Sequence, residues 1–347
     1  MTSLDTLGAP VLAPEPLTWR QRMERAWQHP LFVVTCALIL LVVVFAIVNG
    51  QPFLSPANVR NMFLAGSIML ILAVGVTYVI ITAGFDLSVG SVLVFSGVIS
   101  MIVMREVGGD GWTTALIGLA VAVVCGLGLG WINGLLVAYA ELNPIIVTLG
   151  MFGAALGLAQ VATGGQDLSG MPVSMSQFGV GRILGVPWVV VIAALVAVIA
   201  AIALHSTVFG RHTYAIGSNK EAAVRAGIPV RRHLAVIYGL SGLLAGLAGW
   251  LSLSIYGTTN ISGHSLDALT AATAAILGGA SLFGGVGTIA GTALGNAIPV
   301  VLASGLVIAG LQSFWQQVVT GAVLVGALYL DRLRRIRSLK RSSSAPS

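Results

Sequence analysis

The chain has 347 residues and a net charge of +6; 57% of its residues are hydrophobic and only 8% are charged. Ordinary soluble domains carry roughly a quarter charged residues, so this composition excludes a water-soluble globule. The apolar residues form runs of about twenty, the length of a helix that crosses a hydrocarbon core of roughly 30 Å. Short alternating strands typical of outer-membrane barrels are absent. Because lipid requires backbone amides to be paired within their own segment, the sequence predicts an all-α, polytopic inner-membrane helical bundle.

About ten transmembrane helices are predicted, with eight as the alternative count. We expect a cytoplasmic N-terminal tail at 1–28, a transmembrane domain at 29–332 and a basic cytoplasmic C-terminal tail at 333–347. The predicted spans in chain order are 31–49, 61–82, 87–104, 113–138, 145–163, 187–208, 234–256, 267–284, 287–308 and 314–331.

The distribution of Lys and Arg predicts the orientation, since these residues gather on the cytoplasmic side of membrane proteins. With the N-terminus in the cytoplasm, the inner segments hold three basic residues before the first span, five in 209–233 and six in 332–341. The outer segments then hold only Arg60, Arg105 and Arg182. This asymmetry favours an even number of spans with both termini cytoplasmic. It also explains the positive charge without nucleic acid as a partner.

Two polar loops interrupt the apolar pattern. The Gly/Ser-rich loop 164–186 is expected outside and is long enough to fold over an entrance. The cytoplasmic loop 209–233 predicts a short helix over Lys220–Ala226, with Asn219 as its N-cap and Gly227 at its C-terminal stop. From composition alone, this loop is equally well a solvated connector or a docking site for a cytoplasmic partner.

Few polar residues stand in or beside the spans. Asp86 and Asp267 each precede or open an apolar run, where a carboxylate is well placed to cap a helix, and this interpretation is favoured over a substrate ligand. Asn133 lies within a span and either bonds a neighbouring helix or faces a water-filled path. The glycines of 278–287 indicate either close helix packing or a broken helix.

The sequence predicts neither a catalytic site nor a metal site. Cys36 and Cys125 lie in apolar runs without a Cys or His at metal-ligand spacing, and paired carboxylates or an activated nucleophile are missing. Gly285–Ala290 matches a dinucleotide fingerprint by chance, because an apolar helix rather than a strand precedes it. The chain also lacks the phosphate loop GxxxxGK[ST], so any ATP that drives it must be bound by another subunit.

Several motifs together resemble the permeases of ribose-type ABC importers, a family that also serves xylose, galactose and polyols. The resemblance covers about residues 55–332. Its motifs are Thr82–Ser91 (TAGFDLSVGS), Asn133–Ala138 (NGLLVA), Leu142–Gly150 (LNPIIVTLG), Phe209–Arg211 (FGR), Tyr214–Asn219 (YAIGSN), Ala222–Ala223, Ala226–Ile228, Leu266–Leu269 (LDAL), Gly278–Gly285 (GGASLFGG) and Ser313–Gln317 (SFWQQ).

This resemblance implies a permease subunit of the bacterial cytoplasmic membrane that conducts a small neutral sugar or polyol. Its implied partners are a second permease copy, a cytoplasmic ABC ATPase that binds ATP and Mg, and an extracytoplasmic sugar-binding protein. The loop 209–233 is similar to the family's coupling loop. The residues expected to couple to the ATPase are Arg211, Tyr214, Gly217, Asn219, Ala222, Ala223, Gly227 and Ile228.

Candidate path residues and departures from the family pattern follow from the same motifs. The sequence has Ala83-Gly84 in place of the usual double glycine, and His264-Ser265 in place of Tyr-Glu at the expected outer mouth. The candidates for the translocation path or for helix breaks are Asp86, Ser88, Ser91, Asn133, Asn143, Asp267, Gly278 and Gly279.

The main alternative is an ion-coupled secondary transporter. Such a transporter needs titratable groups or ion-binding helix breaks near the membrane midplane. The sequence places its span-flanking carboxylates near segment ends, and this favours the ATP-driven importer.

Overall fold

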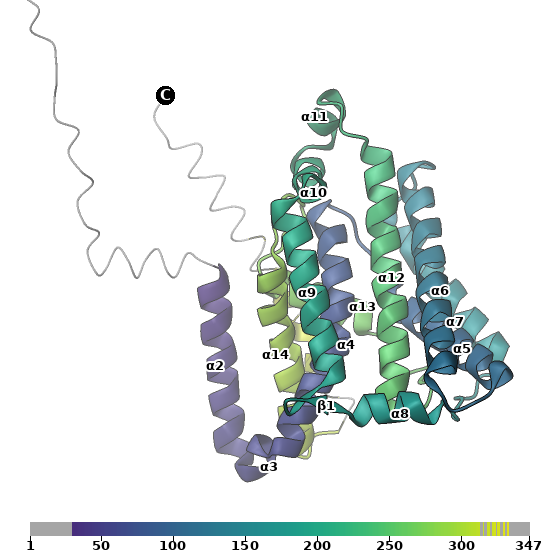
Figure 1. Cartoon of the computed structure of the whole chain (residues 1–347). Helices are drawn as coiled ribbons and strands as arrows, with labels where there is room; N and C mark the ends of the chain where they lie inside the picture. The colour runs from purple at the N-terminus through teal and green to yellow at the C-terminus, as the bar shows by residue number, and fades with distance from the viewer. Residues whose placement is uncertain are drawn as a thin grey trace, which may run out of the picture.

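A computed structural model describes residues 30–312 and isolated positions between 315 and 332. Almost all ordered structure in this part is helical (Figure 1). Eight of its helices are long and apolar enough to cross a membrane, which confirms a polytopic helical fold. They are α2 (Pro30–Asn49), α4 (Pro56–Ile81), α5 (Val89–Val107), α6 (Trp112–Ala138), α7 (Pro144–Thr163), α9 (Trp188–Ser206), α12 (Val230–Tyr256) and α14 (Ile289–Ile308).

Shorter elements join these helices. They are α3 (Gln51–Leu54), α8 (Val173–Val180), the hairpin strands β1 (Arg182–Ile183) and β2 (Val186–Pro187), α10 (Val208–Ser218), α11 (Lys220–Arg225) and α13 (Asp267–Leu277). Figure 1 shows α10 and α11 at one end of the bundle and α3, β1 and α8 at the other. We call these the α11 end and the α8 end.

The predicted span 267–284 is wrong. Its helical part, α13, has only 11 residues, or about 16 Å at 1.5 Å per residue, which is half of a hydrocarbon core. The chain leaves the helix after Leu277 because the following segment contains glycines with positive φ, at Gly279, Gly284 and Gly285 among others. The structure therefore shows a non-helical segment at 278–288 between α13 and α14.

Other predictions fall outside the described residues. The tails 1–28 and 333–347 lie beyond them, and so does most of the predicted span 314–331. The described part of the chain therefore neither completes the count of ten nor places the termini.

Helix α12 forms the centre of the bundle. It contacts α6, α4 and α5, and both α4 and α12 are buried along most of their length. By contrast, Val34 is the one buried residue among 31–49 of α2, which contacts α14 and the short α3. Such exposed apolar surface is expected where lipid is the solvent.

Glycines allow α6 and α12 to approach at backbone distance. A Cβ added at Gly242 of α12 would meet the backbone of Gly126 and Gly130 on α6, and one added at Gly246 would meet Ala122. In lipid, where hydrophobic burial does not hold helices together, such small residues permit the close packing that does. A Cβ added at Gly128, between the two α6 glycines, would have no neighbouring atom within 4 Å, so this position faces away from the contact.

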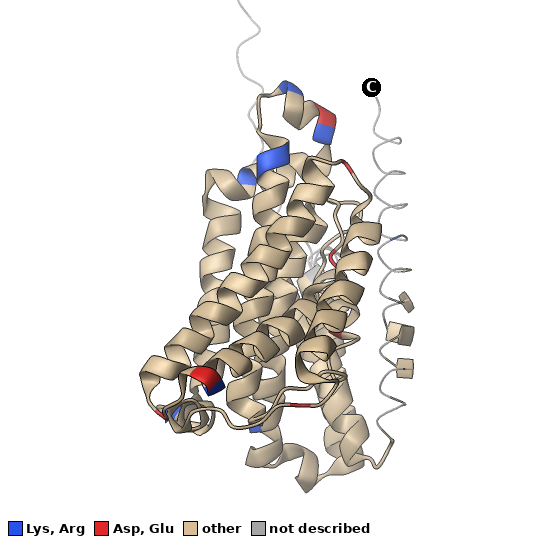
Figure 2. Ribbon diagram, turned by 90° about the vertical axis from the view of Figure 1, so that its right-hand side faces the viewer, with Lys and Arg blue, Asp and Glu red and all other residues tan. Residues whose placement is uncertain are grey.

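Basic residues lie near the two ends of the bundle. Figure 2 shows Lys and Arg gathered around α10 and α11 at one end, with fewer at the opposite end. The basic residues at the α11 end are Arg211, Lys220, Arg225, Arg231 and Arg232. Arg105 and Arg182 lie near the α8 end, in the segments that join α5 to α6 and α8 to α9.

Candidate functional site

The chain turns back into the bundle after α4. Helix α4 ends at Ile81, Ala83 adopts a positive φ of 60°, and the segment 82–88 runs non-helically to the start of α5. Asp86, within this segment, contacts Ser241, which lies eleven residues into α12 and therefore about 16 Å from its first residue. The first break thus reaches deep into the bundle instead of remaining at its end.

Asp86 organises a buried polar cluster, which we define as Asp86, Ser88, Asn133 and Ser241. Its Oδ1 accepts hydrogen bonds from the Ser88 amide (3.0 Å) and hydroxyl (2.7 Å), and its Oδ2 accepts one from the Ser241 hydroxyl (2.8 Å). Asn133 of α6 donates to Ser88 Oγ at 2.9 Å. This cluster, the Asp86 cluster, fixes the start of α5 to both α6 and α12.

The cluster refines two predictions made from the sequence. Asp86 is buried and accepts the amide hydrogen of Ser88, the residue that the structure places at the N-cap of α5. Asp86 therefore stabilises the helix start from two residues upstream. Asn133 is fully buried and bonds a neighbouring segment, the first of the two roles considered for it. Ser91 donates to the Ser88 carbonyl at 2.9 Å, within the first turn of α5.

A second break lies between α12 and α13. Residues 257–266 are mostly non-helical, and Leu266 occupies the N-cap of α13 without a side-chain cap, so Asp267 is the first helical residue and not the N-cap. Its carboxylate still lies where the helix dipole favours negative charge. Asp267 Oδ2 lies 2.7 Å from His264 Nδ1, and both side chains are largely buried.

The first and second breaks meet inside the bundle. The His264 carbonyl lies against Gly90, so closely that a side chain at Gly90 would collide with it. The first turns of α5 and α13 are therefore neighbours, although nearly 180 residues separate them in sequence. Each brings a carboxylate, Asp86 or Asp267, to the positive end of a helix.

The third break, residues 278–288, lies at the α11 end. The Gly285 amide donates to the Ile81 carbonyl at 2.8 Å, which joins this break to the end of α4. Gly278 packs against the backbone of Gly291 in α14, where a side chain would not fit. Gly278 thus shows close packing, and Gly279 lies in the non-helical segment that follows α13.

The segment 209–233 forms two short helices at the α11 end. Asn219 Oδ1 accepts the Ala222 amide at 2.9 Å, so it caps α11 as predicted. Gly227 has a φ of 78° beyond the end of this helix, also as predicted. The Ile228 amide donates to the Ala223 carbonyl at 3.1 Å and closes the turn, while Ala223 is buried against its neighbours.

Helix α10 links α11 to the breaks. Tyr214 donates from its hydroxyl to the Gly287 carbonyl at 2.6 Å, and burial raises the pKa of Tyr214, which keeps the phenol protonated as a donor. Gly217 packs directly on the Ile81 carbonyl and the Gly285 amide. Thr213 Oγ1 lies 2.9 Å from His233 Nε2, at the start of α12. Helix α10 thus connects α11 to both the first and the third break.

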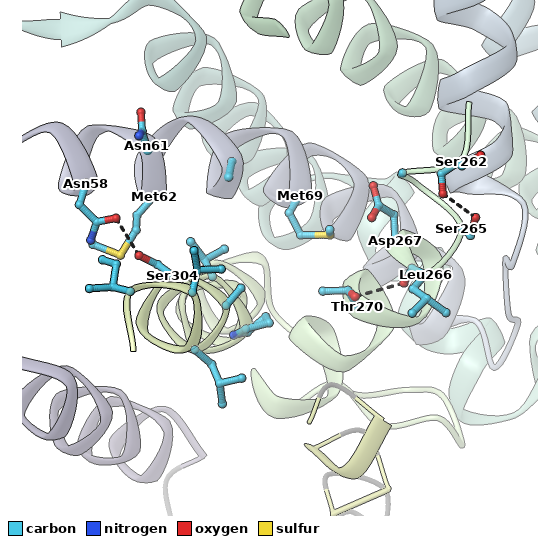
Figure 3. Close-up of a pocket in the computed structure, with 18 residues that line it drawn as sticks. Asn58, Asn61, Met62, Met69, Ser262, Ser265, Leu266, Asp267, Thr270 and Ser304 are labelled. Atoms are coloured by element: carbon cyan, nitrogen blue, oxygen red, sulfur yellow. Dashed lines mark hydrogen bonds between the residues drawn. The ribbon is translucent and has the colours of Figure 1, made fainter. Parts of the chain in front are cut away.

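A cavity of about 560 Å³ lies between α4, α14 and the second break. Figure 3 shows Asp267 beside Met69 at one side of this cavity and Asn58 with Ser304 at the other. Asn58 Oδ1 accepts the Ser304 hydroxyl at 2.8 Å, which connects the α8-end portions of α4 and α14. The cavity volume falls in the range of roughly 300–1,000 Å³ that is usual for small-molecule sites.

The residues predicted to line the translocation path lie in different parts of the structure. Asp267 and Ser265 line the cavity, whereas Asp86, Ser88 and Asn133 belong to the buried Asp86 cluster. Asn143 does neither, because it caps α7 by accepting the Ile145 amide at 2.9 Å. The cavity residues on α4 and α14 were not predicted, because their apolar surroundings contain no motif.

The loop 164–186 is hydrogen-bonded to the second break. Asp167 Oδ1 accepts hydrogen bonds from the Thr259 hydroxyl (3.2 Å) and the Ile261 amide (3.0 Å), and Leu168 donates to Thr259 Oγ1 at 2.8 Å. The loop expected to fold over an entrance is thus anchored to the segment that precedes His264.

Comparison with known proteins matches residues 58–328 to the family described as the permease component of the branched-chain amino acid transport system. The match covers more than half of the chain. This chain belongs to that permease family.

Its relatives in the family include several sugar permeases. It is 40% identical over 300 residues to the ribose import permease RbsC of Bacillus subtilis, an alignment that covers 85% of this chain and 90% of the relative. It is 34% identical to the D-allose transport system permease AlsC of Escherichia coli, with 85% and 90% covered. It is 35% identical to the fructose import permease FrcC of Rhizobium meliloti, with 87% and 85% covered. No solved structure matches this permease.

Proposed function

We propose that this permease is the membrane subunit of an ATP-driven ABC importer for a small neutral sugar or polyol in the bacterial cytoplasmic membrane. The named relatives support a carbohydrate, because ribose, allose and fructose are all small and uncharged. ATP and Mg belong on a separate cytoplasmic ATPase, and an extracytoplasmic binding protein delivers the sugar. A second permease copy completes the path.

The connection of α10 and α11 to the helix breaks carries this proposal. ATP binding closes the ATPase pair and displaces α11, which is exposed at the end of the bundle. Helix α10 passes the displacement to Ile81 and to 278–288 through Gly217 and Tyr214. Because these segments begin or end the broken spans, their movement changes access to the cavity. An ion-coupled carrier does not require an exposed helix that transmits movement from a cytoplasmic partner.

Uptake by the reconstituted importer tests the proposal. In proteoliposomes with the ATPase and binding protein, uptake of D-ribose, D-allose, D-fructose or D-galactose is expected to require internal ATP and to persist when an uncoupler removes the proton gradient. Uptake that proceeds without the ATPase and collapses with the uncoupler would instead show an ion-coupled carrier.

Charge reversal on α11 tests the docking of the ATPase. Val224 and Arg225 are exposed on α11 and make no buried contact, so Val224→Asp combined with Arg225→Glu leaves the fold intact. We expect the ATPase recovered with the purified permease to fall by roughly tenfold or more, which corresponds to about 1.4 kcal/mol. Arg182→Glu, at the α8 end, is the matched control and should keep normal recovery. Equal recovery of ATPase with both variants would exclude α11 as the docking element.

The topology that we propose has ten crossings with both termini cytoplasmic. It consists of the eight spanning helices, the interrupted crossing 257–277 and a last span at 314–331. Its support is the gathering of basic residues around α10 and α11, which the positive-inside rule places in the cytoplasm.

Single cysteines test this topology in a background with Cys36→Ser and Cys125→Ser. An impermeant maleimide added to spheroplasts should label Ser169→Cys, in the exposed loop near the α8 end, and should label Ser3→Cys and Ser347→Cys only after the membrane is opened. Labelling of either terminal cysteine in intact cells would contradict the even count.

A further inference from the structure

The cavity next to the second break has the lining of a site for a neutral, hydroxyl-rich molecule. Its polar side chains are amides, hydroxyls and one carboxylate, and no Lys or Arg is among its lining residues. The remaining lining is apolar, with Met62 and Met69 on α4. The polar lining side chains include Asn58, Asn61, Ser265, Asp267, Thr270 and Ser304.

Asp267 is the strongest acceptor in this lining. One of its oxygens, Oδ2, is held by His264 at 2.7 Å, and the hydrogen bonds of the described residues leave Oδ1 free to accept from a ligand. The Asp267 side chain is only 16% exposed, so its hydrogen bonds are shielded from water and correspondingly strong. The free oxygen can therefore accept a hydrogen bond from a ligand hydroxyl.

We propose that this cavity is a transient binding station for a neutral polyhydroxylated ligand of monosaccharide size, in which Asp267 accepts ligand hydroxyls and His264 holds its carboxylate in position. This inference rests on the proposed import function and extends it to a site inside the permease. Anionic ligands are repelled by Asp267 in a cavity without basic side chains. Met69, which lies beside Asp267 at the same side of the cavity, contacts the C–H face of a sugar ring.

The geometry also connects occupancy of the site to the broken spans. His264, which holds Asp267, presents its carbonyl to Gly90 at the start of α5. The start of α5 is fixed to α12 through Asp86 and Ser241. A ligand bound to Asp267 is therefore connected through His264 to the junction of α5 and α13. His264 is therefore a positioning residue.

Protection of a cavity cysteine from modification tests the station. Thr270→Cys is prepared in the Cys36→Ser, Cys125→Ser background, in nanodiscs, and treated with a small methanethiosulfonate reagent. We expect at least one of D-ribose, D-allose, D-fructose and D-galactose to slow this modification several-fold at millimolar concentration, and choline to have no effect. Leu184→Cys in the β1–β2 turn, where Leu184 is 100% exposed, is the matched control, and its modification should be unchanged by any sugar.

Substitutions of Asp267 and His264 test the role of each residue in ligand binding. Adding Asp267→Asn to Thr270→Cys should raise the protecting sugar concentration about tenfold, and Asp267→Glu should recover part of the loss. His264→Ala should weaken protection less than Asp267→Asn, and His264→Asn, which retains a donor, should restore it in part. A merely structural role for His264 would instead change the modification rate without sugar. Monodisperse elution of each variant establishes that it is folded.

The outcomes separate this inference from the import function. If the Thr270→Cys importer takes up sugar with ATP and none of the four sugars protects the cysteine, the station is excluded and the import function stands. If sugar protects the cysteine equally well with and without Asp267→Asn, Asp267 does not bind the ligand. If choline protects the cysteine and no sugar does, the ligand is not neutral. Failure of ATP-driven uptake by the unmodified importer counts against the proposed function itself.

Discussion

Replacing Gly242 with valine is expected to leave little folded permease, because it separates the two most closely packed helices. A Cβ at this position would lie 2.7 Å from the Gly130 Cα and would also meet the Gly126 carbonyl. These are backbone atoms, so no change of side-chain rotamer relieves the collision. Overpacked cores lose roughly 1–3 kcal/mol, and a collision with backbone falls at or above the top of that range.

The chain supplies a matched control in Gly128→Val. Gly128 lies on α6 between Gly126 and Gly130, and nothing lies within 4 Å of its Cβ position. Both substitutions introduce the same β-branched residue into a helix, so their intrinsic helix propensities cancel. Size-exclusion profiles and thermal unfolding in detergent should show a large loss for Gly242→Val and a small change for Gly128→Val. Similar profiles for the two variants would show that the α6–α12 contact does not determine stability.

Asp86→Leu is expected to have the second largest effect. It removes the acceptor of three buried hydrogen bonds, from the Ser88 amide, the Ser88 hydroxyl and the Ser241 hydroxyl. Each buried polar group left without a partner costs about 1–3 kcal/mol. The hydroxyls can rotate toward other acceptors, but the Ser88 amide is fixed by the backbone. We therefore expect a loss of about 3 kcal/mol and a failure of uptake.

Asp86→Asn separates the hydrogen bonds from the charge. The Asn oxygen still accepts from Ser88, and the new amide donates to Ser241 once its hydroxyl turns, so most of the thermal stability should remain. The measurement is the unfolding temperature in detergent together with ATP-driven uptake in proteoliposomes. An Asp86→Asn variant as unstable as Asp86→Leu would mean that the negative charge itself, and not the hydrogen-bond geometry, holds the start of α5.

Features that depend on neighbouring residues were predicted well from the sequence. Span lengths, the Asn219 cap and the Gly227 stop follow from local composition and backbone preference, and the structure places them close to the expected positions. The boundaries of the predicted span 267–284 failed because an apolar glycine-rich segment resembles a helix in a hydropathy pattern whether or not its backbone is helical.

The depth of Asp86 was not predictable in this way. Its position between two apolar runs suggested a place near the membrane surface, yet Ser241, 155 residues later, donates to it within the bundle. A pairing over such a distance leaves no signal in a single sequence. The glycine contact between α6 and α12 has the same character, since the pattern identifies close-packing residues but not the helix they meet.

The peripheral position of α2 has a consequence for how the chain is made. The side-chain amide of Asn49 donates to the Gly305 carbonyl at 2.8 Å, and Phe45 covers the same glycine, so the docking partner of α2 lies 256 residues further on. At translation rates of about 5–20 residues per second, α14 leaves the ribosome roughly 13–50 s after Asn49. During that time α2 must remain alone in lipid, for which it has the highest mean hydropathy of the eight spanning helices. Helix α2, the first of the eight spanning helices in chain order, is thus among the last to form its native contacts.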